Sequence, residues 1–465
     1  MALSITQIPK YRYLTAGEDI IFTASDAPTV LLYKKVKFIA EVYVSDTPIV
    51  PITSPIGTFK TTPNAVGVGI FDFSPILESF VSPDNVANDG SKYKAAITAD
   101  DSTPVHIIDE FSRNKNTVRY FAIVFKIEYL DETTGLIVEG DIEKNSESYT
   151  YFNGYLKHTD VLDITGNDFG YNLNRFFLKQ VSVVGDVTAK FLTNAPMVQN
   201  ALATDYGTIS MFSFPNGTNN MLSFIRLTYT DSSGVETSED VPNIATNGGF
   251  TIFSSKSTDQ ILFFGCYPAN IYNWSLAFKF LVDANNLKSY TVQGFNADSS
   301  LVTTSLKINI LCPNLKGFEP IRLTWLNQWG TWDYYTFNMK SSKSVSTKGS
   351  TYQQIEGTWN KYRYEINGYK GGKKSFRVNS TEKIKMNTDF VSEAESEWFE
   401  ELINSPEVYI LNGYQEDRPF SYLNNYVIPV RLTTSSYTRK TIANDKLMQY
   451  TFEVEKSKIL RTQSV

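Results

Sequence analysis

Histidine is almost absent from this 465-residue chain, which has only His106 and His158. Neither has a second histidine three or four positions away, and each stands far from the other in the sequence. Zinc sites and most nucleophilic triads require a histidine. The sequence therefore predicts no metal ligand set and no catalytic residue, and we expect both histidines to have structural roles.

Cysteine and long apolar segments are also scarce. Cys266 and Cys312 are too few for a disulfide framework or a zinc finger in a chain of this size, and we expect buried thiols, with pairing left open. Apolar runs such as Ile261–Phe264 are far shorter than a membrane span. Met1–Lys10 lacks the basic and apolar regions of a secretory signal. We therefore expect a soluble protein made in the cytoplasm that does not use the ordinary secretory route.

Aromatic residues, in contrast, are abundant. They make up 14% of the chain, with 28 tyrosines and 31 phenylalanines, and such rings favour β-structure and large contact surfaces. The formal net charge is −6, which does not favour binding to bulk nucleic acid.

A hairpin-like pattern occurs three times. Ile321–Gly330, continued by Thr331–Phe337, is an aromatic-rich strand, turn and strand, and it shares residues with Ile225–Gly234 and, more weakly, with Phe125–Gly135. Copies spaced by roughly a hundred residues indicate related modules in tandem. We predict a mainly β fold of three sandwich-like or barrel-like modules with few short helices. The modules span residues 1–165, 166–312 and 313–465, with boundaries at Thr165–Gly170 and Cys312–Gly317.

Local patterns place several elements within these modules. Ser74 and Pro75 indicate a helix start, with serine as the N-cap. The clearest helix signal is a capping box at residues 392–395, which predicts an amphipathic helix near 392–404. Strands are predicted at apolar runs that include Val30–Tyr33, Lys37–Tyr43, Val118–Tyr129 and Ser275–Val282.

Basic and aromatic residues alternate between Trp359 and Lys385, a pattern that suits an acidic partner or single-stranded nucleic acid. The acidic net charge favours an acidic protein partner, and an edge hairpin whose lysines block strand pairing is the alternative without a binding role. We also predict that Lys340–Ser350 is a polar interface loop. The interface hypothesis names Lys361, Arg363, Tyr369, Lys370, Lys373, Lys374 and Arg377.

Other candidate sites are weaker. Gly368–Ser375 lacks the glycine and the following helix of a phosphate loop, and the Asx-rich segment Asp163–Asp168 lacks the glycine and glutamate of a calcium loop. No cofactor or metal is predicted from them. A tryptophan cluster could stack a sugar ring but is more often part of a core; its members are Trp325, Trp329 and Trp332.

Three segments carry a resemblance to virion proteins of tailed phages that infect Bacteroidota. They are Trp325–Asp333, the helix-to-strand passage Glu397–Tyr409 and the terminal Asn444–Glu455, and the similarity covers about the last 145 residues. The resemblance implies a tail, neck or baseplate component of a virion assembled in the host cytoplasm. It also implies other virion proteins as partners, and such parts form homo-oligomeric rings.

Two other functions remain open from the sequence. One is a glycan-binding protein for host adsorption that uses exposed tryptophan and tyrosine. The other is a polysaccharide hydrolase, for which the sequence shows no located carboxylate pair.

Overall fold

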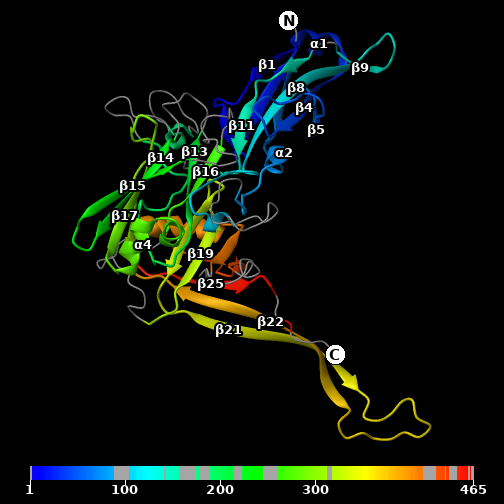
Figure 1. Cartoon of the computed structure of the whole chain (residues 1–465). Helices are drawn as coiled ribbons and strands as arrows, with labels where there is room; N and C mark the ends of the chain where they lie inside the picture. Colours follow the sequence, from blue (N-terminus) through cyan, green and yellow to red (C-terminus); the bar gives the residue numbers. More distant parts are fainter. Residues whose placement is uncertain are drawn as a thin grey trace. The chain divides into compact units, whose positions relative to one another are not determined.

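β-Strands dominate the computed structural model of the chain (Figure 1). The described residues form twenty-five strands and five short α-helices, and the strands make several open sheets. The predicted mainly β fold with few short helices is therefore confirmed. Of the helices in the described ranges, none has the length and apolar character needed to cross a bilayer. The structure describes residues 3–87, 104–140, 143–156, 173–178, 188–213, 222–243, 260–311, 317–411, 426–434, 436–438, 448–458 and 461.

The chain divides into two compact units. Unit 1 comprises Met1–Leu311 and Leu326–Asp333, and unit 2 comprises Cys312–Trp325 and Tyr334–Val465. The boundary predicted at residues 165–170 lies outside the described residues, so the division into three modules stays a prediction.

The first part of unit 1 is organised around two long antiparallel strands, β4 (Lys34–Ser45) and β8 (Val118–Leu130). They belong to a sheet with the order β2-β11-β8-β4-β5, and β9 and β10 also pair with β8. A second sheet has the order β1-β3-β6. Side chains that alternate along the strands bury one face of each sheet in a shared core, which includes Phe22, Phe38 and Phe121. The other bounds are β1 (Ser4–Gln7), β2 (Tyr13–Thr15), β3 (Ile21–Ser25), β5 (Gly57–Thr61), β6 (Val68–Asp72), β9 (Ile137–Glu139), β10 (Lys144–Asn145) and β11 (Tyr149–Phe152).

The second part of unit 1 contains a five-stranded sheet, β12-β18-β17-β14-β15, and a three-stranded sheet, β13-β16-β7. Strand β7 precedes residue 165, so its pairing with β16 joins residues from the first two predicted modules in one sheet. The strands are β7 (Phe111–Arg113), β12 (Val198–Ala201), β13 (Thr208–Ser213), β14 (Phe224–Asp231), β15 (Glu236–Pro242), β16 (Gln260–Gly265), β17 (Leu287–Phe295) and β18 (Leu306–Ile310). The α-helices are α3 (Pro268–Tyr272) and α4 (Leu276–Asp283), and two 3-10 helices are η2 (Val105–Ile107) and η4 (Leu173–Phe176).

The three related hairpins are present, one in each of the three larger sheets. Their turn glycines, Gly135, Gly234 and Gly330, all have positive φ, which glycine adopts at low cost. The turns also share an Asx side chain: Asp231 and Asn327 each accept two hydrogen bonds from turn amides through Oδ1. The repeated sequence pattern therefore records a repeated turn geometry.

Unit 2 contains most of the residues of a seven-stranded sheet with the order β20-β19-β23-β24-β25-β22-β21, together with helix α5 (Glu393–Asn404). The helix packs its aromatic residues on the sheet: the ring centroids of Trp398 and Trp325 are 4.8 Å apart, and those of Phe399 and Phe452 are 5.5 Å apart. The strands are β19 (Ile321–Leu326), β20 (Trp332–Phe337), β21 (Ser342–Gln354), β22 (Gly372–Asn387), β23 (Val408–Leu411), β24 (Val427–Leu432) and β25 (Thr451–Lys456).

The capping box predicted before α5 is present. Ser392 Oγ accepts a hydrogen bond from the Glu395 amide at 3.2 Å, and the Glu395 carboxylate accepts one from the Ser392 amide at 2.8 Å. This exchange satisfies amides that a helix start otherwise leaves unpaired.

The strands predicted at Val30–Tyr33 and Ser275–Val282 are wrong, because both segments are helical. Helix α1 (Ala27–Leu32) begins after Asp26, whose carboxylate accepts from the Thr29 amide, and α4 begins after Ser275, which caps it in the same way. Short apolar runs do not distinguish a strand from a helix, and here the side-chain caps favour the helix.

Helix α2 (Ser74–Glu78) lies within the segment where a helix is predicted, but its cap differs from the prediction. Phe73 occupies the N-cap position, and Ser74 is the first helical residue. Both the amide and the hydroxyl of Ser74 donate to Asp72 Oδ1, so aspartate supplies the capping carboxylate from further upstream.

Candidate functional site

A long exposed hairpin is the main candidate site of unit 2. It comprises β21, β22 and the loop between them, residues 342–387, and we call it the arm (Figure 1). The strands pair from Ser342 opposite Lys385 to Gln354 opposite Gly372, a length of about 44 Å at the usual rise per residue. Within residues 342–378, all of which the structure describes, no side chain is buried.

The arm is anchored at one end. Near the end of β22, Ile384 and Met386 are buried and pair with Val454 and Phe452 of β25. Two ion pairs flank this anchor, between Lys383 and Glu453 at 3.2 Å and between Lys456 and Glu382 at 2.8 Å. Beyond the anchor the arm is a two-stranded ribbon, a structure of marginal stability in water when nothing covers it.

The loop at the far end of the arm, residues 355–371, has its own internal order. Gly357 and Ile366 form a β-bridge, and the Thr358 amide donates to the Glu365 carbonyl at 3.0 Å. Gly371 has φ +92°, and a Cβ there would lie 2.3 Å from Glu356 Cγ, so the return into β22 requires glycine. The loop therefore presents its side chains from a defined backbone.

The structure brings the seven predicted interface residues together on the arm: Lys361, Arg363, Tyr369 and Lys370 in the end loop, and Lys373, Lys374 and Arg377 on β22.

Two of these lysines lie against Tyr369. The Lys370 ammonium lies 5.9 Å from the centre of the Tyr369 ring, and Lys374 donates to the Tyr369 carbonyl at 3.3 Å. Lys373 and Arg377, in contrast, have no acidic partner among the described residues. Their charges are therefore available to an external acidic group.

Aromatic rings on the arm are exposed to an unusual degree. Trp359 is 84% exposed, Tyr362 101% and Tyr369 78%. Tryptophan and tyrosine are enriched at protein interfaces, so rings this exposed mark a candidate contact region. The other exposed large apolar residues of the arm are Val345, Ile355, Tyr364, Ile366, Phe376 and Val378.

Charge is distributed unevenly along the chain. The arm has ten basic and three acidic residues, a net charge of +7, although the whole chain has −6. Unit 1 has 22 basic and 33 acidic residues, a net charge of −11. The arm is therefore a basic element on an acidic protein, which suits an acidic partner surface.

The prediction that Lys340–Ser350 is a loop is wrong from Ser342 onward, because this segment is the first part of β21. Its serines, threonines and lysines show no alternation of apolar and polar residues, since neither face of the ribbon is buried. Backbone pairing with β22 alone makes it a strand. The local sequence gives little signal for a strand, since Val345 and Thr347 are the only β-branched residues from 342 to 350.

The tryptophan cluster belongs to the core. Trp325, Trp329 and Trp332 are all buried, at 0%, 2% and 2% exposure. Trp325 packs on Trp398, and Trp332 Nε1 donates to the Asp84 carbonyl at 2.9 Å. These three rings therefore offer no platform for a sugar.

The residues considered for catalysis are dispersed. His106 is buried with its ring 4.9 Å from that of Trp332, and His158 lies outside the described residues. Cys266 is buried and Cys312 is outside the described ranges, so their pairing stays untested. No three His, Cys, Asp or Glu side chains gather as metal ligands in the part of the chain that the structure describes.

The carboxyl group of Glu18 has a raised pKa. Burial raises the pKa of Glu18 to about 7, although the Thr15 amide donates to its Oε1 at 3.2 Å and lowers it. A single carboxyl group with a raised pKa is not the facing pair that sugar hydrolysis requires.

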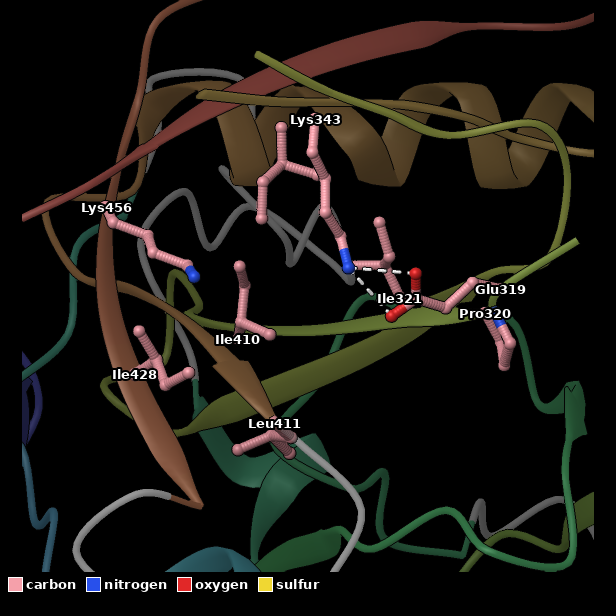
Figure 2. A pocket seen from close by; sticks show the side chains of 9 residues that line it. Glu319, Pro320, Ile321, Lys343, Ile410, Leu411, Ile428 and Lys456 are labelled. Carbon is pink, nitrogen blue, oxygen red and sulfur yellow. Dashed lines mark hydrogen bonds and ion pairs between the residues drawn. The ribbon is translucent and has the colours of Figure 1, made fainter. Parts of the chain in front are cut away.

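A cavity of about 330 Å³ lies where the arm joins the rest of its sheet (Figure 2). Its two lysines are already neutralised, because Lys343 is 2.8 Å from Glu319 and Lys456 is 2.8 Å from Glu382. The cavity is therefore lined by aliphatic side chains together with charged groups that already have partners of opposite charge. The lining residues are Glu319, Pro320, Ile321, Lys343, Ile384, Ile410, Leu411, Ile428 and Lys456.

Comparison of the chain with models of protein families and with curated proteins gives no match. Solved structures similar to it include E. coli alpha-2-macroglobulin in its native conformation, with a TM-score of 0.17 and 9% identity. That match covers 82% of this chain and 21% of the other, so the chain spans about a fifth of that protein. A similarity this low carries no argument about fold or function.

Proposed function

We propose that the chain is a structural component of a tailed-phage virion, of the tail, neck or baseplate type. It acts by holding other subunits, and the arm is its main contact element. The observation that carries the proposal is the arm itself, a paired ribbon and end loop in which no side chain from residue 342 to 378 is buried.

The physical argument concerns stability and charge. A two-stranded ribbon is only marginally stable by its own pairing. Its exposed tryptophan and tyrosine side chains would contribute binding energy when a partner protein covers them. The +7 charge adds orientation, because complementary charge steers association and disfavours wrong partners. The segments that resemble virion proteins also supply the sheet and helix to which the arm is anchored.

Incorporation into particles tests this proposal. A tagged chain is expressed in cells that produce the phage, and purified virions are examined by mass spectrometry and immunogold electron microscopy. We expect the wild-type chain in virions and at least a tenfold loss for the variant Lys373→Glu/Lys374→Glu/Arg377→Glu. Absence of the wild-type chain from virions would refute the proposed function.

A glycan-binding role in host adsorption is the second candidate, because Trp359 and Tyr362 are exposed rings of the kind that stack on sugars. A glycan array distinguishes the two functions. Glycan binding by the wild-type protein that is lost in Trp359→Ala would support the adsorption role. The absence of glycan binding by the wild-type protein would rule that role out.

A further inference from the structure

The chain carries two parts of opposite net charge. The arm has a net charge of +7, whereas unit 1 has −11. The two sets of charges lie in separate parts of the sequence, so each copy of the chain presents a basic element and an acidic one.

We propose that the arm of one copy binds unit 1 of a second copy. This inference rests on the proposed function and deepens it by naming the partner of the arm. Such a contact uses different surfaces on the two copies, and repetition of it generates either a closed ring or a filament.

The charge of the whole chain favours a second copy over nucleic acid. Cations interleaved with exposed aromatic rings suit single strands, but the residues outside the arm carry −13, the difference between −6 for the chain and +7 for the arm. That charge opposes the approach of a phosphate backbone. The same charge on a neighbouring copy attracts the arm.

The aromatic residues supply the short-range part of the contact. Trp359, Tyr362 and Arg363 lie together in the end loop, and Trp, Tyr and Arg are the residues that most often dominate binding energy at protein interfaces. We therefore expect the end loop to be covered in the assembly, while the charges on β22 set its orientation and salt dependence.

Light scattering after size exclusion tests the idea on the full-length purified chain. The chain is measured at about 0.05 M and about 0.5 M NaCl, which bracket the ionic strength where the Debye length is about 8 Å. We expect oligomers at low salt and at least a tenfold weaker self-association at high salt. Lys373→Glu/Lys374→Glu/Arg377→Glu should remain monomeric at both.

A matched control separates a specific contact from general repulsion. Lys279→Glu/Lys288→Glu/Lys307→Glu makes the same change in net charge at exposed positions of unit 1. If the arm binds unit 1, this variant assembles as well as wild type or better. If it loses assembly as fully as the arm variant does, net repulsion explains both results and the proposal is wrong.

Photocrosslinking identifies the partner surface. A benzophenone side chain introduced at Tyr362, which is fully exposed, should yield crosslinked dimers whose peptides map to unit 1. Dimers crosslinked only from arm to arm would overturn the proposal. A chain that is monomeric at both salt concentrations, yet needs its arm to enter virions, would refute the second copy as partner and leave the proposed function standing.

Nucleic acid binding is measured in parallel with a fluorescent oligothymidine. We expect no change in anisotropy with wild-type protein. Binding that disappears in the arm variant would assign the arm to single-stranded nucleic acid and overturn the inference.

Discussion

The two ends of strand β22 show how one strand can serve two purposes. Ile384 and Met386, near its C-terminal end, are 4% and 0% exposed, whereas Phe376 and Val378, a few residues earlier, are 50% and 41% exposed. All four side chains are apolar, and both ends pair with β21. The difference is the added presence of β25 beside the C-terminal end. Pairing makes a strand, but a core forms only where further elements cover it.

The largest expected effect comes from removing a ring of α5 that is buried against β25, in comparison with an exposed ring of the arm. Phe399→Ala deletes a fully buried ring of α5 that packs on Phe452, and such a truncation costs about 3–5 kcal/mol. Phe376→Ala deletes a half-exposed ring of the arm and should change stability by less than about 0.5 kcal/mol. Differential scanning calorimetry of the transition of unit 2 measures both. Equal effects would mean that the arm is packed in the isolated chain.

The helix cap gives the next largest effect. Ser392→Ala removes the hydroxyl that accepts from the Glu395 amide and should cost about 1 kcal/mol. Ser344→Ala on β21 is the matched control, since Ser344 is exposed, and a change below about 0.5 kcal/mol is expected. Chemical denaturation followed by tryptophan fluorescence resolves the difference, and a control as damaging as the cap variant would contradict this account.

The anchor of the arm should show a smaller, pH-dependent effect. Hydrogen bonds from Thr433 and then Lys383 lower the pKa of Glu453 below its ordinary value of 4.5. Because the folded state holds this carboxylate ionised, the stabilisation is present above about pH 4.5 and is lost as pH falls through the lowered value. Melting temperatures measured from pH 7 to strongly acidic pH should fall less steeply for Glu453→Gln than for wild type.

Glu356→Gln is the control for that experiment, because this arm carboxylate has no hydrogen-bond partner among the described residues. Its acid profile should follow that of wild type. If Glu356→Gln reduced the dependence of the melting temperature on pH as much as Glu453→Gln does, the effect would not be specific to the anchor carboxylate.

The smallest effect is expected for the charges of the arm. Lys373→Glu/Lys374→Glu/Arg377→Glu should change the free energy of unfolding of the isolated chain by about 0.5 kcal/mol or less, because exposed charges contribute little to folding stability. The same variant is expected to lose self-association. Calorimetry, which measures stability, and light scattering, which measures association, should therefore show that these charges contribute to binding and not to folding. A loss of several kcal/mol would assign these charges to the fold.

Local signals account for the parts of the fold that sequence reasoning located. The capping box at Ser392 and Glu395 and the turn glycine at Gly330 act within four residues, so their patterns are complete in the sequence. The segment after Ser275 was misread because its apolar run is compatible with both secondary structures until the serine cap is seen. Strand β21 was missed because its identity depends on a partner strand that begins about twenty residues later.

The sequence shows which residue types make up the candidate site, but it does not show that their side chains are exposed. The cations and rings between Trp359 and Arg377 are visible in the sequence as an alternation, and all of them lie on the arm. That the arm leaves them uncovered is a tertiary fact, because exposure depends on whether distant elements reach the ribbon.

The sequence by itself determined the turns and the cap, which depend on residues close together in the chain, and the uneven distribution of charge, which depends on composition alone. Only the tertiary structure decided which tryptophans are core and which are surface. Trp325 is buried and Trp359 is 84% exposed, although both lie in aromatic-rich, strand-like segments. The physical reason is that burial requires a second layer, and helix α5, which covers Trp325, comes from a segment more than sixty residues away and does not cover Trp359.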